Sequence, residues 1–237
     1  MHAAWLFGGL AAGFLGGCAA VPEGPRGSYH PDVAVPAPVA AETAATPLGL
    51  LVIDRLADDF PQAGEVREAA EIDLIVVHSI GGPICRDGAI WFTPAKGSAV
   101  FWRDWFLGEG GKSIHYVIGR EGDIAQQRPE LRMAGHVSFG GILQQVNRRS
   151  IGIELVNRGD GNEPFPGEQI AALSALVAEI AARYDLPPEA LVTHAALDDR
   201  MQPHCGGVPL RRNPDPGPLF PLEDVRAAAW APETSPH

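Results

Sequence analysis

The stretch that decides the fold is Ile72-Asp73-Leu74-Ile75-Val76-Val77, which is followed directly by His78. A nearly continuous apolar run of this kind, rich in β-branched residues, is expected of a central strand that is buried on both faces of a sheet. A second short run, Leu191-Val192-Thr193, leads in the same way to His194. Each histidine is therefore predicted at the end of a strand, and both rings can project from the same edge of one sheet.

Strands and helices alternate along the sequence on both sides of these runs. Residues 113–127 are predicted to form two strands around a turn at 120–123, and residues 150–156 to form a further strand. Helices are predicted at residues 99–107, which are rich in Trp and Phe, and at residues 222–230. One more helix is indicated by residues that recur at spacings of three and four and so line one face: Ile170, Leu173, Val177, Ile180 and Tyr184. The pattern predicts a single α/β domain with a central mixed β-sheet flanked by helices.

Residues 1–47 differ in composition from this folded part. The uncharged stretch 3–17 is too short to span a bilayer but suits the apolar core of a secretion signal. It leads to Leu15-Gly16-Gly17-Cys18, which resembles the lipobox of bacterial lipoproteins, although no Lys or Arg precedes it. Residues 19–47 are dominated by Ala, Pro, Gly and Val and cannot bury enough apolar surface to offset their ordering entropy. We predict a signal peptide over 1–18 with lipidation of Cys18, a tether over 19–47 and a folded domain over 48–237.

Charge and cysteine content restrict the partners and the compartment. The formal net charge of −11 argues against nucleic acid, because a surface that binds phosphates needs clustered Lys and Arg. A lipid on Cys18 would anchor the protein to a membrane, at the periplasmic face of a Gram-negative outer membrane; the alternative is a soluble periplasmic protein. In such an oxidising compartment Cys85 and Cys205 can pair. A disulfide and two free thiols both stay open.

Three residues have the chemistry of a metal site: His78, His194 and Asp215. Two neutral imidazoles and one carboxylate leave one coordination position of zinc open for water, as in catalytic zinc sites. Asp215 lies in Asn213-Pro214-Asp215-Pro216-Gly217-Pro218, where the prolines restrict the backbone and can hold the carboxylate in place. Taken alone, each residue has a simpler interpretation as a polar strand end or a turn residue.

Glu154 is an acidic residue in an otherwise apolar predicted strand. Ile151, Ile153 and Leu155 share one face of that strand, whereas Gly152 and Glu154 share the other. Because burial of an unpaired charge is costly, this carboxylate should have a partner or a task. One such task is that of a general base toward a water activated by a metal. The alternative is an edge strand with Glu154 in solvent.

Five sequence blocks identify a family resemblance, and they are specific because they occur together and in order. The blocks are Ile75–His78, Ser113–Ile118, Asn147 with Ser150–Leu155, Leu191–His194 and Asp215–Phe220. From about Ile72 to Leu222, the chain resembles the type-2 N-acetylmuramoyl-L-alanine amidases, which share their fold with peptidoglycan recognition proteins. With its lipobox, the chain is most similar to the lipoprotein amidases of the Gram-negative outer membrane.

The resemblance implies that His78, His194 and Asp215 bind zinc at the strand ends and that Glu154 orients or deprotonates the attacking water. It also implies that residues 48–237 form an amidase catalytic domain. Its substrate would be peptidoglycan or muropeptides, in which it hydrolyses the amide bond between N-acetylmuramic acid and L-alanine of the stem peptide. Two alternatives stay open: a binding module of the same fold that does not cut peptidoglycan, and a metal hydrolase of ordinary peptides.

Two departures from the family concern the segment before the aspartate ligand. The family usually carries a Lys two residues before that ligand, placed to stabilise the oxyanion, whereas this chain has Asn213. Arg212 is expected to supply the positive charge, or Asn213 a neutral hydrogen bond. The segment between His194 and Asp215 is also longer than in compact members of the family. Its His204 and Cys205 are expected to be loop residues rather than ligands.

Three further polar residues fall in or near the matching blocks. By the resemblance, His115 is expected to line the substrate groove and Asn147 to contact substrate. His136 lies where the family often has a histidine-containing loop, but the match there is poor. We interpret His136 as a polar histidine whose hydrogen bonds are satisfied within the protein.

Overall fold

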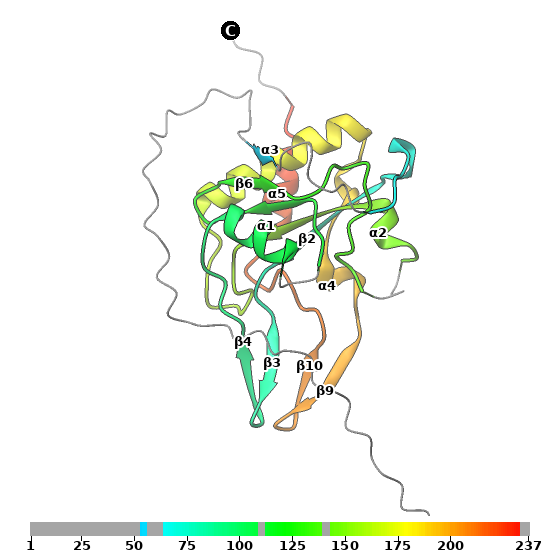
Figure 1. Ribbon diagram of the computed structural model, residues 1–237. Coiled ribbons are helices and arrows are strands. Elements are labelled where there is room, and N and C mark those ends of the chain that lie inside the picture. The colour runs from blue at the N-terminus through cyan, green and yellow to red at the C-terminus, as the bar shows by residue number, and fades with distance from the viewer. Residues whose placement is uncertain (1–52, 56–63, 109–111, 139–142, 233–237) are drawn as a thin grey trace, which may run out of the picture. The chain divides into compact units, whose positions relative to one another are not determined.

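The computed structural model describes residues 53–55, 64–108, 112–138 and 143–232 (Figure 1). Their centre is a six-stranded sheet in the order β1-β6-β5-β7-β2-β8. Strands β5 and β6 are antiparallel, and every other neighbouring pair in this sheet is parallel. The sheet is therefore mixed, as predicted. Its strands are β1 (Ile53–Arg55), β2 (Leu74–Ser79), β5 (Tyr116–Ile118), β6 (Ile124–Gln126), β7 (Ser150–Leu155) and β8 (Leu191–Thr193).

Helices cover both faces of the sheet. Helices α3 (Gly167–Tyr184) and α5 (Leu222–Ala229) pack on one face, where Ile153 of β7 and Val77 of β2 are completely buried. Helix α1 (Ala99–Leu107) packs on the opposite side, and its Trp102 and Phe106 belong to a second apolar cluster. The prediction of one α/β domain with a central sheet flanked by helices is confirmed.

Two antiparallel hairpins lie side by side beyond the end of the main sheet (Figure 1). One consists of β3 (Pro83–Arg86) and β4 (Ala89–Phe92), and the other of β9 (Met201–Cys205) and β10 (Val208–Arg211). A disulfide joins Cys85 to Cys205, with their Cα atoms 5.5 Å apart, which decides between the two alternatives left open by the sequence. His204 and Cys205 are strand residues, so the expectation of a loop was wrong at both positions.

Four short helical turns complete the described structure: η1 (Ala69–Glu71), α2 (Val146–Arg149), η2 (Pro188–Ala190) and α4 (His194–Leu197). Among the described residues, none of the helices has the length and apolar character needed to cross a membrane. The predicted signal peptide and tether, with Cys18, lie outside the described residues.

Candidate active site

The parallel strands bring three polar residues to one line across the sheet. In the register of β2 and β7, His78 lies opposite Glu154. In the register of β2 and β8, Val77 lies opposite Thr193. His78 comes directly after Val77 and His194 directly after Thr193, so the two histidines follow two residues that are paired across the strands. Neighbouring strands in a sheet are about 4.8 Å apart. The carboxyl ends of β7, β2 and β8 therefore place a carboxylate and two imidazoles next to one another.

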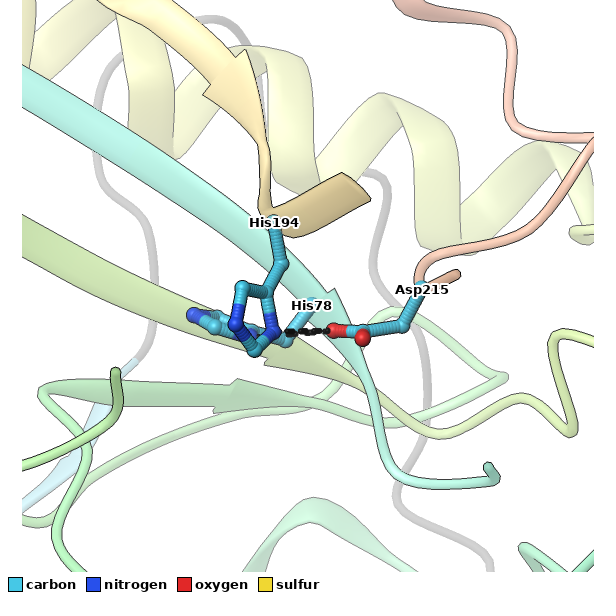
Figure 2. Close-up of side chains that lie close together, drawn as sticks. All are labelled: His78, His194 and Asp215. Atoms are coloured by element: carbon cyan, nitrogen blue, oxygen red, sulfur yellow. Dashed lines mark hydrogen bonds and ion pairs between the residues drawn. The ribbon is translucent and has the colours of Figure 1, made fainter. Parts of the chain in front are cut away.

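Asp215 joins the two histidines from a loop far along the chain (Figure 2). Its Oδ2 lies 3.0 Å from Nδ1 of His78 and 3.1 Å from Nδ1 of His194. One ligand atom from each of the three residues lies within 4.8 Å of the other two. In a tetrahedral site with bonds of about 2.0–2.1 Å to zinc, ligand atoms are about 3.3 Å apart. The three donor atoms thus have the chemistry and nearly the spacing that a zinc ion requires.

The electrostatics of the cluster favour the protonation states that bind a metal. Burial lowers the pKa of His78 to about 4, so its imidazole is neutral at neutral pH. Burial opposes ionisation of Asp215, but its contacts with His194 and His78 hold the pKa of its carboxyl well below the ordinary range. Neutral imidazole and ionised carboxylate are the forms that act as ligands.

Close backbone packing holds the loop that carries Asp215. The amide of Ala195 donates to the carbonyl of Asp215 at 2.8 Å, which ties the loop to the start of α4. Gly217 has a φ of +101°, and a Cβ at that position would lie 2.4 Å from the carbonyl oxygen of Gly159. A side chain at Gly217 would therefore both strain the backbone and separate the two loops.

Glu154 faces this cluster without a hydrogen-bond partner for its Oε2. Within the described part of the chain, that buried oxygen accepts no hydrogen bond. Burial, with a further contribution from Asp215, raises the pKa of Glu154 to about 8, while Lys112 acts in the opposite direction. The predicted alternation is confirmed, because Ile151, Ile153 and Leu155 are buried in the core. A carboxyl group in such a position is available for proton transfer.

His136 makes contacts that sequence reasoning did not foresee. Its Nδ1 lies 2.9 Å from Nε2 of His78, and its Nε2 lies 3.0 Å from Oγ of Ser150. The prediction of a histidine satisfied within the protein is confirmed, but one partner is a histidine of the candidate metal site. No signal in the sequence pairs His136 with His78, which is 58 residues away.

His115 does not line a groove, so this expectation was wrong. Its side chain is completely buried, and Nδ1 accepts a hydrogen bond of 2.9 Å from the amide of Gly152. The bare Nδ1 leaves the proton on Nε2, which then donates to the carbonyl of Arg132 at 3.0 Å. The ring is held between β7 and the segment before the His136 loop, which makes it structural. Buried Arg67, which sequence reasoning missed, contacts the same ring and donates to the carbonyl of Ser150.

Asn147 uses its amide to hold the segment that contains His136. Its Oδ1 accepts from the amides of His136 and Val137 at 3.2 and 2.9 Å, and its Nδ2 donates to the carbonyl of Val137 at 2.7 Å. Asn147 also borders an open hollow of about 510 Å³, together with Met133 and Arg148. Contact between Asn147 and substrate stays a prediction.

The residues near the missing family lysine form their own polar cluster. Asn213 donates to the completely buried carboxylate of Asp198, which also accepts two hydrogen bonds from the guanidinium of Arg200 and one from its backbone amide. Arg212 is exposed. The ammonium of Lys112, which sequence reasoning also missed, interacts electrostatically with both His78 and Glu154. The roles expected of Arg212 and Asn213 stay predictions, and Lys112 is a further cation whose charge acts on both His78 and Glu154.

The profile of the N-acetylmuramoyl-L-alanine amidase family matches residues 68–218. The chain is 37% identical over 111 residues to N-acetylmuramoyl-L-alanine amidase AmiD of Escherichia coli K12, covering 43% of this chain and 36% of AmiD. A relative from Rickettsia conorii is 34% identical over 132 residues, covering 52% of this chain and 45% of the relative. The matched region is therefore less than half the length of each relative.

Solved structures share the fold. The crystal structure of a selenomethionine derivative of AmpD has a TM-score of 0.53 at 23% identity, covering 76% of this chain and 96% of that chain. The N-acetylmuramoyl-L-alanine amidase LysC of Clostridium intestinale has a TM-score of 0.50 at 20% identity, covering 75% of this chain and 97% of that chain. At such identities the similarity supports the fold alone.

Proposed function

Because this chain belongs to the N-acetylmuramoyl-L-alanine amidase family, we propose that it is a zinc-dependent amidase of peptidoglycan. It hydrolyses the amide bond between N-acetylmuramic acid and L-alanine of the stem peptide, in peptidoglycan or in muropeptides. The observation that carries the proposal is the convergence of His78 Nδ1, His194 Nδ1 and Asp215 Oδ2 near the carboxyl group of Glu154, whose Oε2 accepts no hydrogen bond from the described residues.

The three clustered residues would hold the zinc ion. A zinc ion with three protein ligands supplies Lewis acidity, which lowers the pKa of water and polarises a carbonyl oxygen. The donor set fits this ion because zinc is bound in proteins by imidazole nitrogen and carboxylate oxygen. The buried and neutral His78 adds no positive charge that would repel a cation.

Glu154 moves the proton in the proposed reaction. In its ionised form, Glu154 takes a proton through its free Oε2 from the attacking water, whose oxygen bonds to the lactyl carbonyl carbon of muramic acid. The same carboxyl group then gives the proton to the nitrogen of L-alanine as the C–N bond breaks. The products are a free muramic acid carboxylate and a free stem peptide. Lys112, together with Arg212 or Asn213, supplies positive charge or a hydrogen bond for the developing oxyanion.

The test is an assay of purified protein on muropeptides, with mass spectrometry of the products. Wild type with zinc should release free stem peptide, and the metal-free protein should regain this activity when zinc is returned. Glu154→Gln should bind zinc and fail to cleave. Glu223→Gln is the matched control, because Glu223 is exposed in the first turn of α5. Full activity of Glu154→Gln would remove that residue from the mechanism.

Two other functions can be distinguished in the same assay. A binding module of this fold would bind sacculi without releasing stem peptide. A hydrolase of ordinary peptides would cleave unglycosylated peptides as well as muramoyl peptides. The proposed amidase releases stem peptide from muramoyl substrates and leaves unglycosylated peptides intact.

The proposed location is the periplasmic face of the outer membrane, with a lipid on Cys18. The support is the lipobox-like Leu15-Gly16-Gly17-Cys18 after an uncharged stretch. Labelled fatty acid should be incorporated into the wild-type chain in a Gram-negative host and not into Cys18→Ser. Equal labelling of both would contradict the anchor, and a soluble periplasmic wild type would support the alternative.

A further inference from the structure

Three hydrogen bonds connect His78 to the backbone of α2 through two side chains. Nε2 of His78 lies 2.9 Å from Nδ1 of His136, and Nε2 of His136 lies 3.0 Å from Oγ of Ser150. The hydroxyl of Ser150 donates to the carbonyl of Val146 at 2.6 Å. The chain of contacts begins on the side of the His78 ring opposite the nitrogen that faces Asp215.

The carbonyl of Val146, at the far end of this chain of contacts, determines which atom of each pair donates the hydrogen and which accepts it. A carbonyl oxygen only accepts, so the single hydroxyl hydrogen of Ser150 is used toward Val146. Oγ of Ser150 must then accept a hydrogen from Nε2 of His136. A neutral His136 with a hydrogen on Nε2 has a bare Nδ1, which accepts from Nε2–H of His78. A neutral His78 with its hydrogen on Nε2 has a bare Nδ1 directed at the candidate metal site.

The reverse direction would break the chain. If Nδ1 of His78 carried the hydrogen and donated to Asp215, the bare nitrogens of His78 and His136 would face each other at 2.9 Å. Moving the hydrogen of His136 to Nδ1 would relieve that repulsion, but Ser150 would then have to turn its hydroxyl away from Val146. Ser150 is completely buried. The complete reversal therefore exchanges the hydrogen bond from Ser150 to Val146 for one from His78 to Asp215, and it leaves Nδ1 of His78 protonated, so that this nitrogen cannot bind a metal.

The surrounding structure keeps the His136 ring in place. Asn147 binds the backbone amide of His136. Gly152 leaves room for the ring, because a Cβ at that position would lie 2.6 Å from Cγ of His136. Gly152 and Glu154 share one face of β7, so the strand that carries the candidate base also provides the space for His136.

We infer that His136 and Ser150 are positioning residues that hold His78 in the tautomer whose Nδ1 can bind the metal. Hydrogen-bond partners on the far side of the ring fix the tautomer and ring orientation of a ligating histidine. The inference rests on the zinc binding in the proposed function and assigns two residues to it. Neither residue is placed in contact with substrate.

The experiment measures zinc affinity, independently of amide cleavage, in four variants of the full chain. His136→Asn places an acceptor oxygen where Nδ1 was, because both atoms are two bonds from Cβ. His136→Gln places an amide nitrogen near the former Nε2 position but offers His78 no acceptor there. His136→Ala and Ser150→Ala remove the first and second members of the chain. Competition with a chromophoric chelator at constant pH gives the dissociation constant, and thermal unfolding of each metal-free variant checks its folding.

We expect the two amide variants, His136→Asn and His136→Gln, to differ in their zinc affinity. His136→Gln and His136→Ala should bind zinc about 10- to 100-fold more weakly than wild type, the usual loss when a ligating histidine loses the hydrogen-bond partner of its other nitrogen. His136→Asn should recover most of this loss, and Ser150→Ala should lose less than His136→Ala because the His78 contact remains. A purely structural role would weaken Asn and Gln variants alike, in step with their melting temperatures.

Equal zinc affinity in wild type, His136→Ala and His136→Gln would overturn the inference. A loss in His136→Asn as large as in His136→Gln would overturn it as well. A wild type that does not bind zinc would refute the proposed function itself. Zinc binding by wild type without any effect of the variants would refute the positioning role alone.

Discussion

The strand ends that carry His78, Glu154 and His194 and the two hairpins beside them are held in place by different interactions. The two regions nevertheless alternate along the chain. The hairpin β3–β4 follows His78 directly, and the hairpin β9–β10 lies between His194 and Asp215. The strand ends are held by parallel hydrogen bonding in a fixed register within the buried core.

The hairpins are more exposed and are held to each other by different means. Trp91 is 57% exposed and Met201 is 54% exposed, whereas Val77 is completely buried. The disulfide between Cys85 and Cys205 joins the two hairpins, and Gly206 packs against Gly88 at their turns. The core of the sheet therefore holds the two candidate histidine ligands, and the covalent link holds the hairpins to each other. The following predictions test that division.

The largest effect is expected at the strand ends. Glu154→Gln should reduce the turnover of muropeptides by about 10²- to 10⁴-fold, the usual contribution of a positioned general base. Steady-state release of stem peptide measures it, and the free energy of unfolding of the variant serves as the control. A reduction of less than tenfold in a folded variant would contradict the role of the carboxylate.

Removal of the disulfide should act on stability and leave the ligands in place. The double variant Cys85→Ser, Cys205→Ser should lower the free energy of unfolding by about 2–4 kcal/mol, because the cross-link restricts the unfolded chain. Its zinc dissociation constant should match that of wild type. Chemical unfolding and chelator competition measure the two quantities. A large loss of zinc affinity would show that the hairpins also hold the ligands, against the division proposed above.

Glu154 should make the metal-free protein less stable at high pH. Burial raises the pKa of Glu154 from an ordinary 4.5 to about 8. Between these values the native state binds the proton and the unfolded state does not, so the free energy of unfolding falls as pH rises and levels off above about 8. The lowered pKa of His78 has the opposite sign and acts below pH 6.5.

The window from pH 6.5 to 8 therefore isolates Glu154. Across this window, the free energy of unfolding of metal-free wild type should fall by about 2 kcal/mol relative to that of Glu154→Gln. Urea unfolding at a series of pH values measures the difference. Parallel curves for the two proteins would mean that the carboxyl group has an ordinary pKa in the native state.

The smallest effect is expected on the exposed surface of the hairpins. Trp91→Ser should change the free energy of unfolding by no more than about 0.5 kcal/mol, because a substitution at an exposed site removes few packing contacts. Val77→Ala, on the neighbouring buried strand, is the matched comparison and should cost about 2 kcal/mol or more. Similar losses in both variants would mean that Trp91 is packed in solution.

Much of the fold was accessible from local patterns. The apolar run before His78, the spacing of Leu173, Val177 and Ile180, and the alternation around Glu154 all predicted elements that the structure contains. These patterns are informative because a strand or helix has to bury one face, and the period of the apolar residues reports which element does so. The hairpins were missed because their strands are short and largely exposed, so they lack that signal.

Local sequence patterns were enough to identify the side chains that end the buried strands, because the burial of a strand is visible in the residues next to one another along the chain. They did not determine which distant groups would meet. Asp215 reaches His78 across 137 positions, and Cys85 meets Cys205 across 120. The same holds for His136, which turns its Nδ1 to His78, and for His115, which is sealed inside the fold. These contacts became visible only in the tertiary structure, because they depend on strand register and on how the loops close. Neither of these produces a periodic pattern in the sequence.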